Sequence, residues 1–173
     1  SESYKTYKCA NLYAYCIERG HNILSQNGHF GMIVPISCIS ATKMTPVQDI
    51  IKNNRMSWIS NYSLRPAKLF EGAELRLTIF LDKTSDSEAI YSTIYNKWNN
   101  EYRPFLFKTL KYNNVNNICI PGSIAKLPSH IYYDIINKMN IKEGNSSLLN
   151  YFLNSNTKHV LYYFRAVQYW FKT

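Results

Sequence analysis

The sequence contains no uninterrupted run of about 18 apolar residues, the length that a membrane-spanning helix needs. Its first residues, SESYKTYKC, lack the apolar stretch of a secretion signal. Four cysteines are present, but no two form a Cys-x-x-Cys pair, and none lies near a histidine at metal-ligand spacing. These absences argue against a membrane span, a disulfide framework and a metal site, and they favour a reducing, cytoplasmic setting.

Signatures of several enzyme classes are also missing. The chain has no Gly-x-Gly-x-x-Gly fingerprint, no Walker A loop and no Gly-x-Ser-x-Gly nucleophile elbow. Its four histidines are scattered without a partner acid or cysteine at a telling spacing. We therefore identify no self-sufficient catalytic site in the sequence, and a cofactor-independent hydrolase has no residues to support it.

Basic residues outnumber acidic ones. Twenty Lys and Arg against 11 Asp and Glu give a formal net charge of +9, and most of the excess falls in residues 83–173. A basic surface favours polyanions, because binding to nucleic acid releases counterions. Fifteen tyrosines suit base stacking, although an AT-rich coding bias also raises Lys, Asn, Ile and Tyr together. Composition leaves nucleic-acid binding and an ordinary solvated surface both open.

The start of the chain has the pattern of a helix followed by a strand. Apolar residues at helical spacing predict a helix over residues 11–25, which Asn27-Gly28 ends. Its expected apolar stripe is Leu12, Tyr15, Cys16, Ile23 and Leu24, with Glu18 and Arg19 on the other side. Residues 30–34 form a short apolar run ending at Pro35, which predicts a strand buried on both faces of a largely parallel sheet.

A second helix, two strands and a loop follow. Thr45 is the expected N-cap of this helix, with Pro46 at its first helical position. Residues 56–62 predict a strand, and residues 75–81 alternate between Leu75, Leu77, Ile79 and Leu81 on one face and Arg76, Thr78 and Phe80 on the other. The order predicts part of an open α/β sheet, incomplete because three strands and two helices leave an exposed edge.

After Asp82 the pattern changes. Residues 90–98 are a candidate strand, residues 112–118 form a polar loop, and residues 128–139 predict a helix. The expected apolar side of this helix is Ile131, Tyr132, Ile135, Ile136 and Met139. Residues 159–171, rich in Tyr, Phe and Val, predict one or two strands.

Two stretches carry a family resemblance. Residues 11–35 read NLYAYCIERGHNILSQNGHFGMIVP, and residues 64–81 read LRPAKLFEGAELRLTIFL. In this order, the Asn-Leu-Tyr helix, the apolar strand ending Val-Pro and the Phe-containing loop before an alternating strand resemble the gamma-class N6-adenine DNA methyltransferases of restriction-modification systems, including type II and IIG enzymes and phage-defence relatives. The resemblance extends over residues 7–82.

The resemblance implies transfer of a methyl group from S-adenosylmethionine to adenine N6 in double-stranded DNA, after the base has left the helical stack. It implies that Phe70 stacks on the extruded adenine, and that Leu12 and Cys16 line the cofactor's adenine pocket, where the family usually has Phe instead of Cys16. Arg65 and Lys68 flank Phe70 and are candidate phosphate contacts. The alternatives are a core Phe70 that anchors the loop, and simple helix packing for Leu12 and Cys16.

Two motifs of that family do not occur here: the Gly-containing cofactor loop and the catalytic Asn-Pro-Pro-Tyr. Both would precede the Asn-Leu-Tyr helix. We therefore expect residues 1–82 to be the C-terminal part of a Rossmann-like catalytic domain, inactive without the remainder of the methyltransferase domain.

Residues 83–173 would then form a connector and the α+β start of a DNA target-recognition region. Residues 160–172 resemble its Tyr-rich strands, with Lys158, Arg165 and Lys172 as candidate phosphate contacts. The alternative for these three residues is an ordinary solvated surface. A restriction or specificity subunit is a further expected partner. The competing hypothesis is a non-catalytic module for nucleic-acid binding or subunit interaction.

Overall fold

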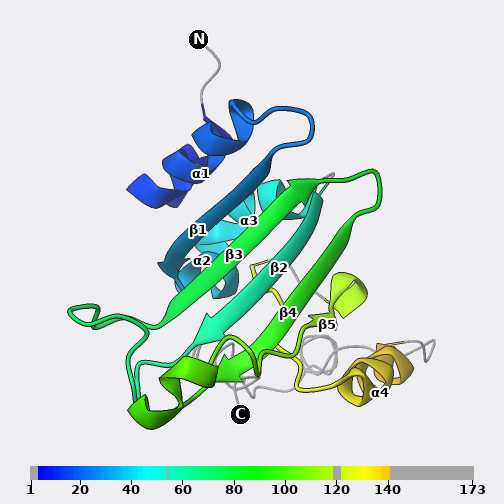
Figure 1. The fold of residues 1–173 in the computed structure, drawn as a ribbon. Coiled ribbons are helices and arrows are strands. Elements are labelled where there is room, and N and C mark those ends of the chain that lie inside the picture. The colour runs from blue at the N-terminus through cyan, green and yellow to red at the C-terminus, as the bar shows by residue number, and fades with distance from the viewer. Residues whose placement is uncertain (1–3, 54, 119–121, 141–173) are drawn as a thin grey trace, which may run out of the picture.

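The protein is described here by a computed structural model, which covers residues 4–53, 55–118 and 122–140 (Figure 1). With 3-10 helices labelled η, the elements are η1 (Lys5–Cys9), α1 (Leu12–Asn22), β1 (His29–Pro35), α2 (Ser37–Ser40), η2 (Thr42–Met44), α3 (Thr45–Lys52), β2 (Arg55–Tyr62), β3 (Leu77–Thr84), β4 (Ala89–Asn96), η3 (Asn100–Phe105), β5 (Asn113–Asn114), η4 (Asn116–Ile118) and α4 (His130–Asn140). The predicted helices and strands within the described residues are present, with shifted ends.

The strands form one mixed sheet in the order β1-β3-β2-β4-β5. Strand β3 runs antiparallel to both β1 and β2, whereas β2 and β4 are parallel. The α/β class is confirmed, but the prediction of a largely parallel sheet is wrong. Its cause is the position of β3, which returns between β1 and β2 instead of extending the sheet at its edge.

Strand β1 is an outer strand of the described sheet and is not buried on both faces. Phe30, Met32 and Val34 face the helices, whereas Ile33 on the other face is 45% exposed. The apolar run suggested burial of both faces because Gly31, which lies on the exposed face, has no polar side chain that would mark that face as exposed. The paired strand β3 shows the same asymmetry, since Phe80 is buried beneath the helices and Leu81 is 52% exposed.

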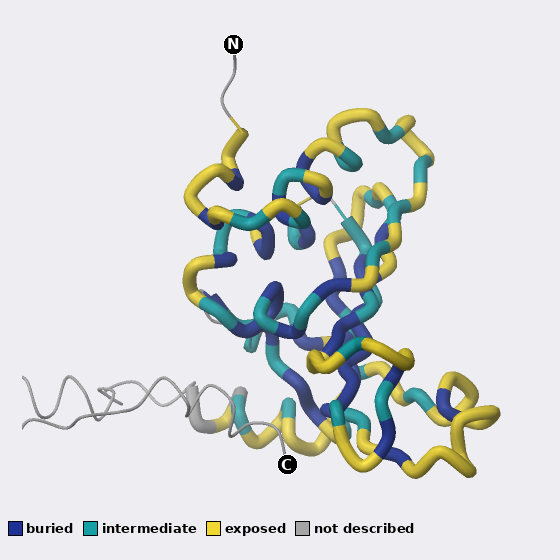
Figure 2. The backbone as a smooth tube through the Cα atoms, turned by 90° about the vertical axis from the view of Figure 1, so that its left-hand side faces the viewer, coloured by how far each residue is buried: buried dark blue, intermediate teal, exposed yellow. Residues whose placement is uncertain are grey.

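A first hydrophobic cluster joins α1, α2 and α3 to one face of the sheet and also includes residues of β4 and of the segment 115–127. Figure 2 shows the buried residues of the described chain in dark blue and the exposed ones in yellow. A second hydrophobic cluster packs near the end of β2. It consists of Tyr62, Ala67, Leu69, Leu77, Trp98 and Leu106.

Helix α1 buries a different face from the predicted one. Ala14, Ile17 and Glu18 are its buried residues, while Leu12 is 76% and Ile23 67% exposed. Glu18 lies inward because three groups of η1 satisfy its carboxylate. Thr6 donates through its hydroxyl at 2.7 Å and its N–H at 2.8 Å, and the Lys5 N–H donates at 2.9 Å.

Helix α3 begins at Thr45, one residue before Pro46, the predicted first helical position, and Pro46 lies in its first turn. The expected cap is wrong, because the Thr45 hydroxyl donates to the Thr42 carbonyl at 2.7 Å and Met44 holds the N-cap position without a side-chain bond. Val47 and Ile51 are fully buried against the sheet.

The segment after β3 continues the same packed structure. Strand β4 confirms the candidate strand and pairs with β2, so the sheet crosses the predicted domain boundary at residues 82 and 83, which stays a prediction. Helix α4 is also confirmed, but Ile131, Tyr132 and Ile135 on its expected apolar side are exposed. The strands expected over 159–171 lie outside the described residues.

Candidate functional site

The parallel strands β1 and β2 end at the same side of the sheet, where open α/β sheets commonly bind ligands. The chain after β1 meets the end of the β2–β3 loop there, because the Ile36 N–H donates to the Arg76 carbonyl at 2.9 Å. A cavity of about 320 Å³ lies at this junction. Its lining residues are Pro35, Ile36, Ser37, Leu64, Glu74, Leu75 and Arg76.

In the β2–β3 loop, residues 63–76, the residues just before Phe70 are held by hydrogen bonds and by buried packing. The Ala67 N–H donates to the Trp98 carbonyl at 3.0 Å, and Leu69 is buried in the second hydrophobic cluster. Arg103 donates to the carbonyls of Lys68 at 2.6 Å and Leu69 at 2.8 Å. The backbone that leads into Phe70 is therefore held by contacts from the η3 segment.

Phe70 itself takes no part in that anchor. Its side chain is 43% exposed, and it belongs to neither hydrophobic cluster of the described residues. Leu69 provides the buried contact that a core residue of this loop would make. The stacking role of Phe70 stays a prediction, but an aromatic ring in this exposed position is free to meet a ligand.

The two candidate phosphate contacts on this loop differ. Arg65 is exposed, and its backbone is held by Ser63, whose Oγ accepts from the Arg65 N–H at 3.1 Å and donates to the Arg65 carbonyl at 2.6 Å. Lys68 forms a surface ion pair with Glu74, whose pKa is lowered by the hydrogen bond and charge of Lys68. A phosphate at Lys68 would therefore compete with Glu74, whereas Arg65 has no ion pair among the described residues.

The start of α1 lies beside the same end of the sheet. The Tyr13 hydroxyl is 3.5 Å from the Ser37 Oγ just after β1, and it donates to the Met44 sulfur at 3.4 Å. Burial raises the pKa of the Tyr13 phenol. Leu12 and Cys16 share the exposed face of α1, one turn apart.

This exposed face fits one wall of an adenine pocket, because an apolar side chain that is 76% exposed is available to a flat ring. The cofactor role of Leu12 and Cys16 stays a prediction. The alternative of simple helix packing agrees poorly with their exposure, since the packed face of α1 is formed by Ala14 and Ile17. Lys158, Arg165 and Lys172 lie outside the described residues.

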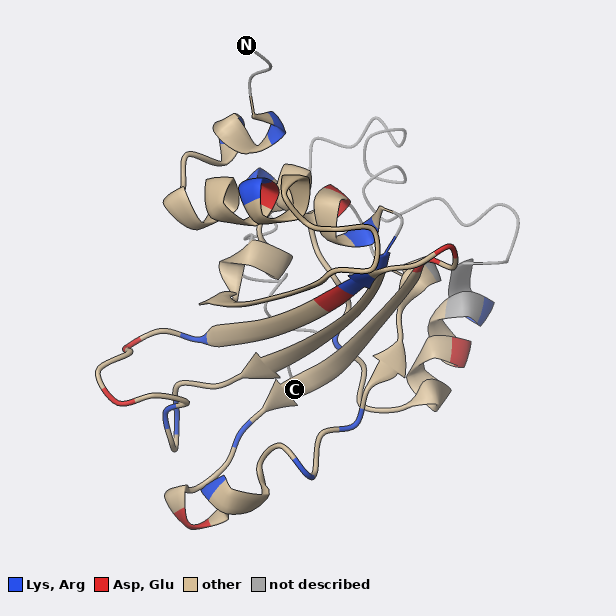
Figure 3. Ribbon diagram, turned by 45° about the horizontal axis from the view of Figure 1, so that its top comes forward, with Lys and Arg blue, Asp and Glu red and all other residues tan. Residues whose placement is uncertain are grey.

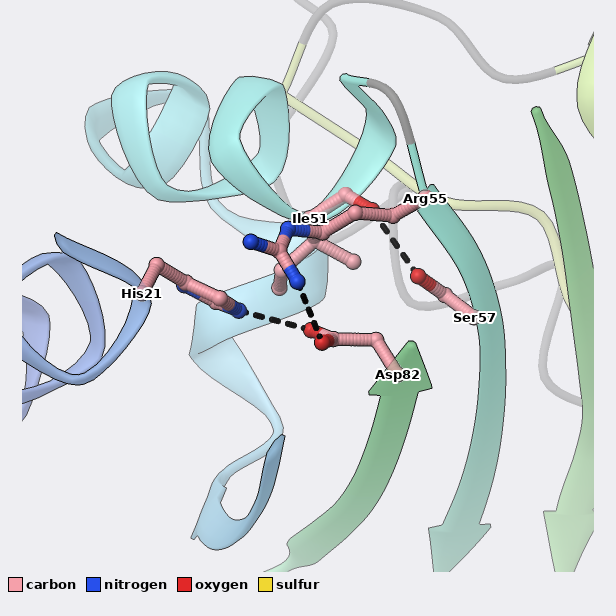
Figure 4. A network of polar contacts seen from close by, with 5 residues as sticks. All are labelled: His21, Ile51, Arg55, Ser57 and Asp82. Atoms are coloured by element: carbon pink, nitrogen blue, oxygen red, sulfur yellow. Dashed lines mark hydrogen bonds and ion pairs between the residues drawn. The ribbon is translucent and has the colours of Figure 1, made fainter. Parts of the chain in front are cut away.

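Sequence reasoning missed a buried ionic network at the opposite end of the sheet (Figure 4). Asp82, fully buried in β3, lies 3.0 Å from Arg55 Nη1 of β2 and 2.8 Å from His21 Nε2 of α1. The His21 ring packs on Phe30 with ring centroids 4.6 Å apart. Close by, the Ser57 hydroxyl donates to the Ile51 carbonyl at 2.8 Å. The spacing of residues in the sequence does not predict this network, because its three ionisable members come from three separate elements.

A second polar network was also missed, and it joins three strands near the candidate site. The buried Asn61 side chain donates to Ser92 Oγ at 3.3 Å and to the Thr93 carbonyl at 3.0 Å, and it accepts from Thr78 Oγ1 at 3.0 Å. These polar atoms find their partners inside the sheet, and the network lies where the register of β2 against β4 shifts between Ile59 and Asn61.

The described part of the chain offers neither a metal cluster nor a membrane span. Within residues 4–53, 55–118 and 122–140, no group of three or more His, Cys, Asp or Glu side chains is placed to hold a metal ion. No helix of the same described part is long and apolar enough to cross a membrane.

Comparison with known proteins places the candidate site in a family context. Residues 1–70 match the family described as Eco57I restriction-modification methylase. This segment contains α1, β1, β2 and the loop as far as Phe70. No curated protein matches the chain. The match supports a restriction-modification methylase family for this segment, and with it a part of a DNA methyltransferase.

Proposed function

We propose that this chain is part of a site-specific DNA methyltransferase that transfers a methyl group from S-adenosylmethionine to adenine N6 in double-stranded DNA. The observation that carries the proposal is the position of Phe70. It is an exposed aromatic side chain on an anchored loop, at the carboxyl ends of β1 and β2, within the segment that matches the methylase family.

In this proposal Phe70 holds the extruded base. An adenine that leaves the duplex loses its stacking partners, and an aromatic face replaces part of that loss at about 1–3 kcal/mol. The loop can present the ring without rearrangement, because Leu69 and Ala67 fix it from the buried side. Arg65 and Lys68 would contact the phosphates beside the extruded nucleotide.

S-adenosylmethionine supplies the methyl group when it is bound to the complete enzyme. This chain would contribute one wall of its adenine pocket through Leu12 and Cys16. The exposed outer edge of β1 would pair with the remainder of the methyltransferase domain. A restriction or specificity subunit is a further proposed partner.

The test uses the methyltransferase domain reassembled with this chain, and it identifies the methylated base by mass spectrometry. Formation of N6-methyladenine supports the proposal, whereas methylation of cytosine alone or of no base contradicts it. Phe70→Ala should lower methylation of duplex DNA roughly five- to a hundredfold, from the 1–3 kcal/mol of stacking. Phe70→Trp should retain much of the activity.

Two controls separate stacking from stability. Ile23→Ala removes an exposed apolar side chain just beyond the other end of α1 and should leave methylation unchanged. Thermal unfolding should show little change for Phe70→Ala, because the ring lies outside both clusters. A destabilised Phe70→Ala enzyme that still flips 2-aminopurine and methylates normally per folded molecule would exclude the stacking role.

A further inference from the structure

The segment after β4 presents aromatic and basic side chains together. We call six of its exposed residues the aromatic–basic surface: Lys97, Tyr102, Phe105, Phe107, Lys108 and Lys111. Tyr102 is 60%, Phe105 55% and Phe107 59% exposed. Residues 97–111 include one acidic residue, Glu101. Figure 3 shows Lys and Arg segments along this part of the chain, beside the long loop between β2 and β3.

The aromatic–basic surface is joined to the Phe70 loop by direct contacts. Arg103 donates to two carbonyls of that loop, at Lys68 and Leu69. Trp98 and Leu106 are buried beside Leu69 in the second hydrophobic cluster. The surface is therefore joined directly to the loop that carries Phe70, and a ligand seated at Phe70 can extend onto it.

Three exposed aromatic rings in such a short segment point to a binding function. The second hydrophobic cluster takes in Trp98 and Leu106, and its Tyr62 meets Phe107 edge-on with ring centroids 6.2 Å apart, yet all three rings remain more than half exposed. Exposed apolar groups gathered together commonly mark an interaction site. The interleaved lysines favour a partner that offers negative charge as well as flat faces, and a nucleic-acid strand has both.

The state of the DNA strand follows from the same chemistry. Bases inside an intact duplex stack on each other and offer no face to a protein ring. Extrusion of one base breaks this stack and exposes the faces of its neighbours. The exposed rings therefore fit a strand with unstacked bases better than an undisturbed duplex.

We infer that the aromatic–basic surface binds an unstacked stretch of DNA adjoining the nucleotide held at Phe70. Tyr102, Phe105 and Phe107 stack on bases, and Lys97, Lys108 and Lys111 contact phosphates without reading sequence. The inference rests on the proposed function, because it takes the extruded nucleotide at Phe70 as its starting point.

The test measures binding of the full 173-residue chain to two fluorescent strands of about 12 nucleotides by anisotropy. One strand carries bases, and the other has the same phosphates with abasic sugars. Phe105→Ala should weaken binding of the base-bearing strand roughly five- to a hundredfold and leave the abasic strand unaffected. Phe105→Trp should restore binding, because the stacking face returns.

The lysines give an independent readout. The double variant Lys108→Gln, Lys111→Gln should weaken binding of both strands and reduce the slope of log affinity against log salt by about 1.4, at about 0.7 for each phosphate that a lysine no longer neutralises. Tyr7→Ala and Lys43→Gln are matched controls, because both side chains are exposed on other elements, η1 and η2. They should change neither affinity nor slope.

Three outcomes would overturn the inference. Equal weakening of the base-bearing and abasic strands by Phe105→Ala would show that the ring acts on structure and not on bases. Unchanged DNA binding together with a changed oligomeric state in sedimentation would assign the surface to a protein partner. If the control variants Tyr7→Ala and Lys43→Gln weakened DNA binding as much as the variants of the aromatic–basic surface, binding could not be assigned to that surface.

The inference and the proposed function fail separately. If the reassembled enzyme forms N6-methyladenine but Phe105→Ala binds both strands normally, only the inference fails. If no adenine is methylated while the base-dependent effect of Phe105→Ala persists, the strand-binding surface stands and the proposed reaction is wrong.

Discussion

The Asp82 carboxylate links helix α1 to strands β2 and β3, and its removal tests how the sheet and its helical layer are held together. Its side chain is fully buried, while the side chains of its partners Arg55 and His21 are 13% and 5% exposed. Asp82→Ala would leave the Arg55 guanidinium and the His21 ring without this acceptor. The neighbouring Phe30 ring offers His21 no replacement.

The size of the effect follows from this burial. Removing one partner of a buried ion pair typically costs about 3–5 kcal/mol. Arg55 keeps partial access to water, so the low end, about 3 kcal/mol, applies here. In a domain of this size each kcal/mol shifts Tm by about 2–4 °C, so Asp82→Ala should lower Tm by roughly 6–12 °C.

The assay is thermal unfolding of a double-mutant cycle built from Asp82→Ala and Arg55→Ala. Residues in direct contact show coupling of about 0.5–3 kcal/mol, so the double variant should lose less stability than the two single losses added together. Asp86→Ala, an exposed acid in the following turn, is the matched control and should stay within about 0.5 kcal/mol of the parent chain. A Tm change of Asp82→Ala as small as that of Asp86→Ala, or strict additivity, would refute the assigned role.

Three further predictions follow from particular residues. Burial alone would raise the pKa of the Glu18 carboxyl, but hydrogen bonds from Thr6 and Lys5 and the Lys5 charge lower it below 4.5. This carboxylate should therefore stabilise the fold above about pH 4.5 and lose that contribution as pH falls through its folded pKa. Chemical denaturation at several pH values should show a weaker acid dependence of stability for Glu18→Gln than for the parent chain. Gly122→Ala should lower Tm more than Gly72→Ala. Both glycines have positive φ, at +84° and +79°, but only at Gly122 would the new Cβ meet a backbone atom, the Cα of Thr42 at 2.6 Å. Equal Tm shifts of the two variants would contradict this. Calorimetric titration of the isolated chain with S-adenosylmethionine should give no measurable binding, because the exposed face of α1 is only one wall of a pocket; a micromolar affinity would contradict it.

Local sequence patterns predicted the helices and strands of this fold better than they predicted which strands pair and which helix faces are buried. The alternation of β3 and a helix start near Pro46 could be predicted because each depends on nearby residues. Insertion of β3 between β1 and β2 was not, since strand pairing is decided between segments far apart in sequence. The buried face of α1 was misjudged for the same reason, because the groups that satisfy Glu18 lie 12 and 13 residues earlier.

The candidate site divides in a similar way. The resemblance placed Phe70 on a loop between two strands, which the structure has, and its exposure meets the requirement of the stacking hypothesis without testing it. The anchoring of that loop could not be predicted, because Arg103 lies 34 and 35 residues beyond the carbonyls that it holds. The pairing of Lys68 with Glu74 was also missed, although both residues belong to the same loop.

The position of β3 bears on how far the methylase-like unit extends. The family match ends at residue 70, yet β1 and β2, both inside the matched segment, do not pair with each other, and β3 fills the place between them. Residues 77–84 are therefore required for the matched strands to form a sheet at all. The next residues are bound to it as well, because β4 pairs with β2 and Trp98 packs with Leu69 beneath the loop that carries Phe70. The division of roles predicted at residue 82 stays a prediction, and the packed structure that would position Phe70 continues across it at least as far as Leu106.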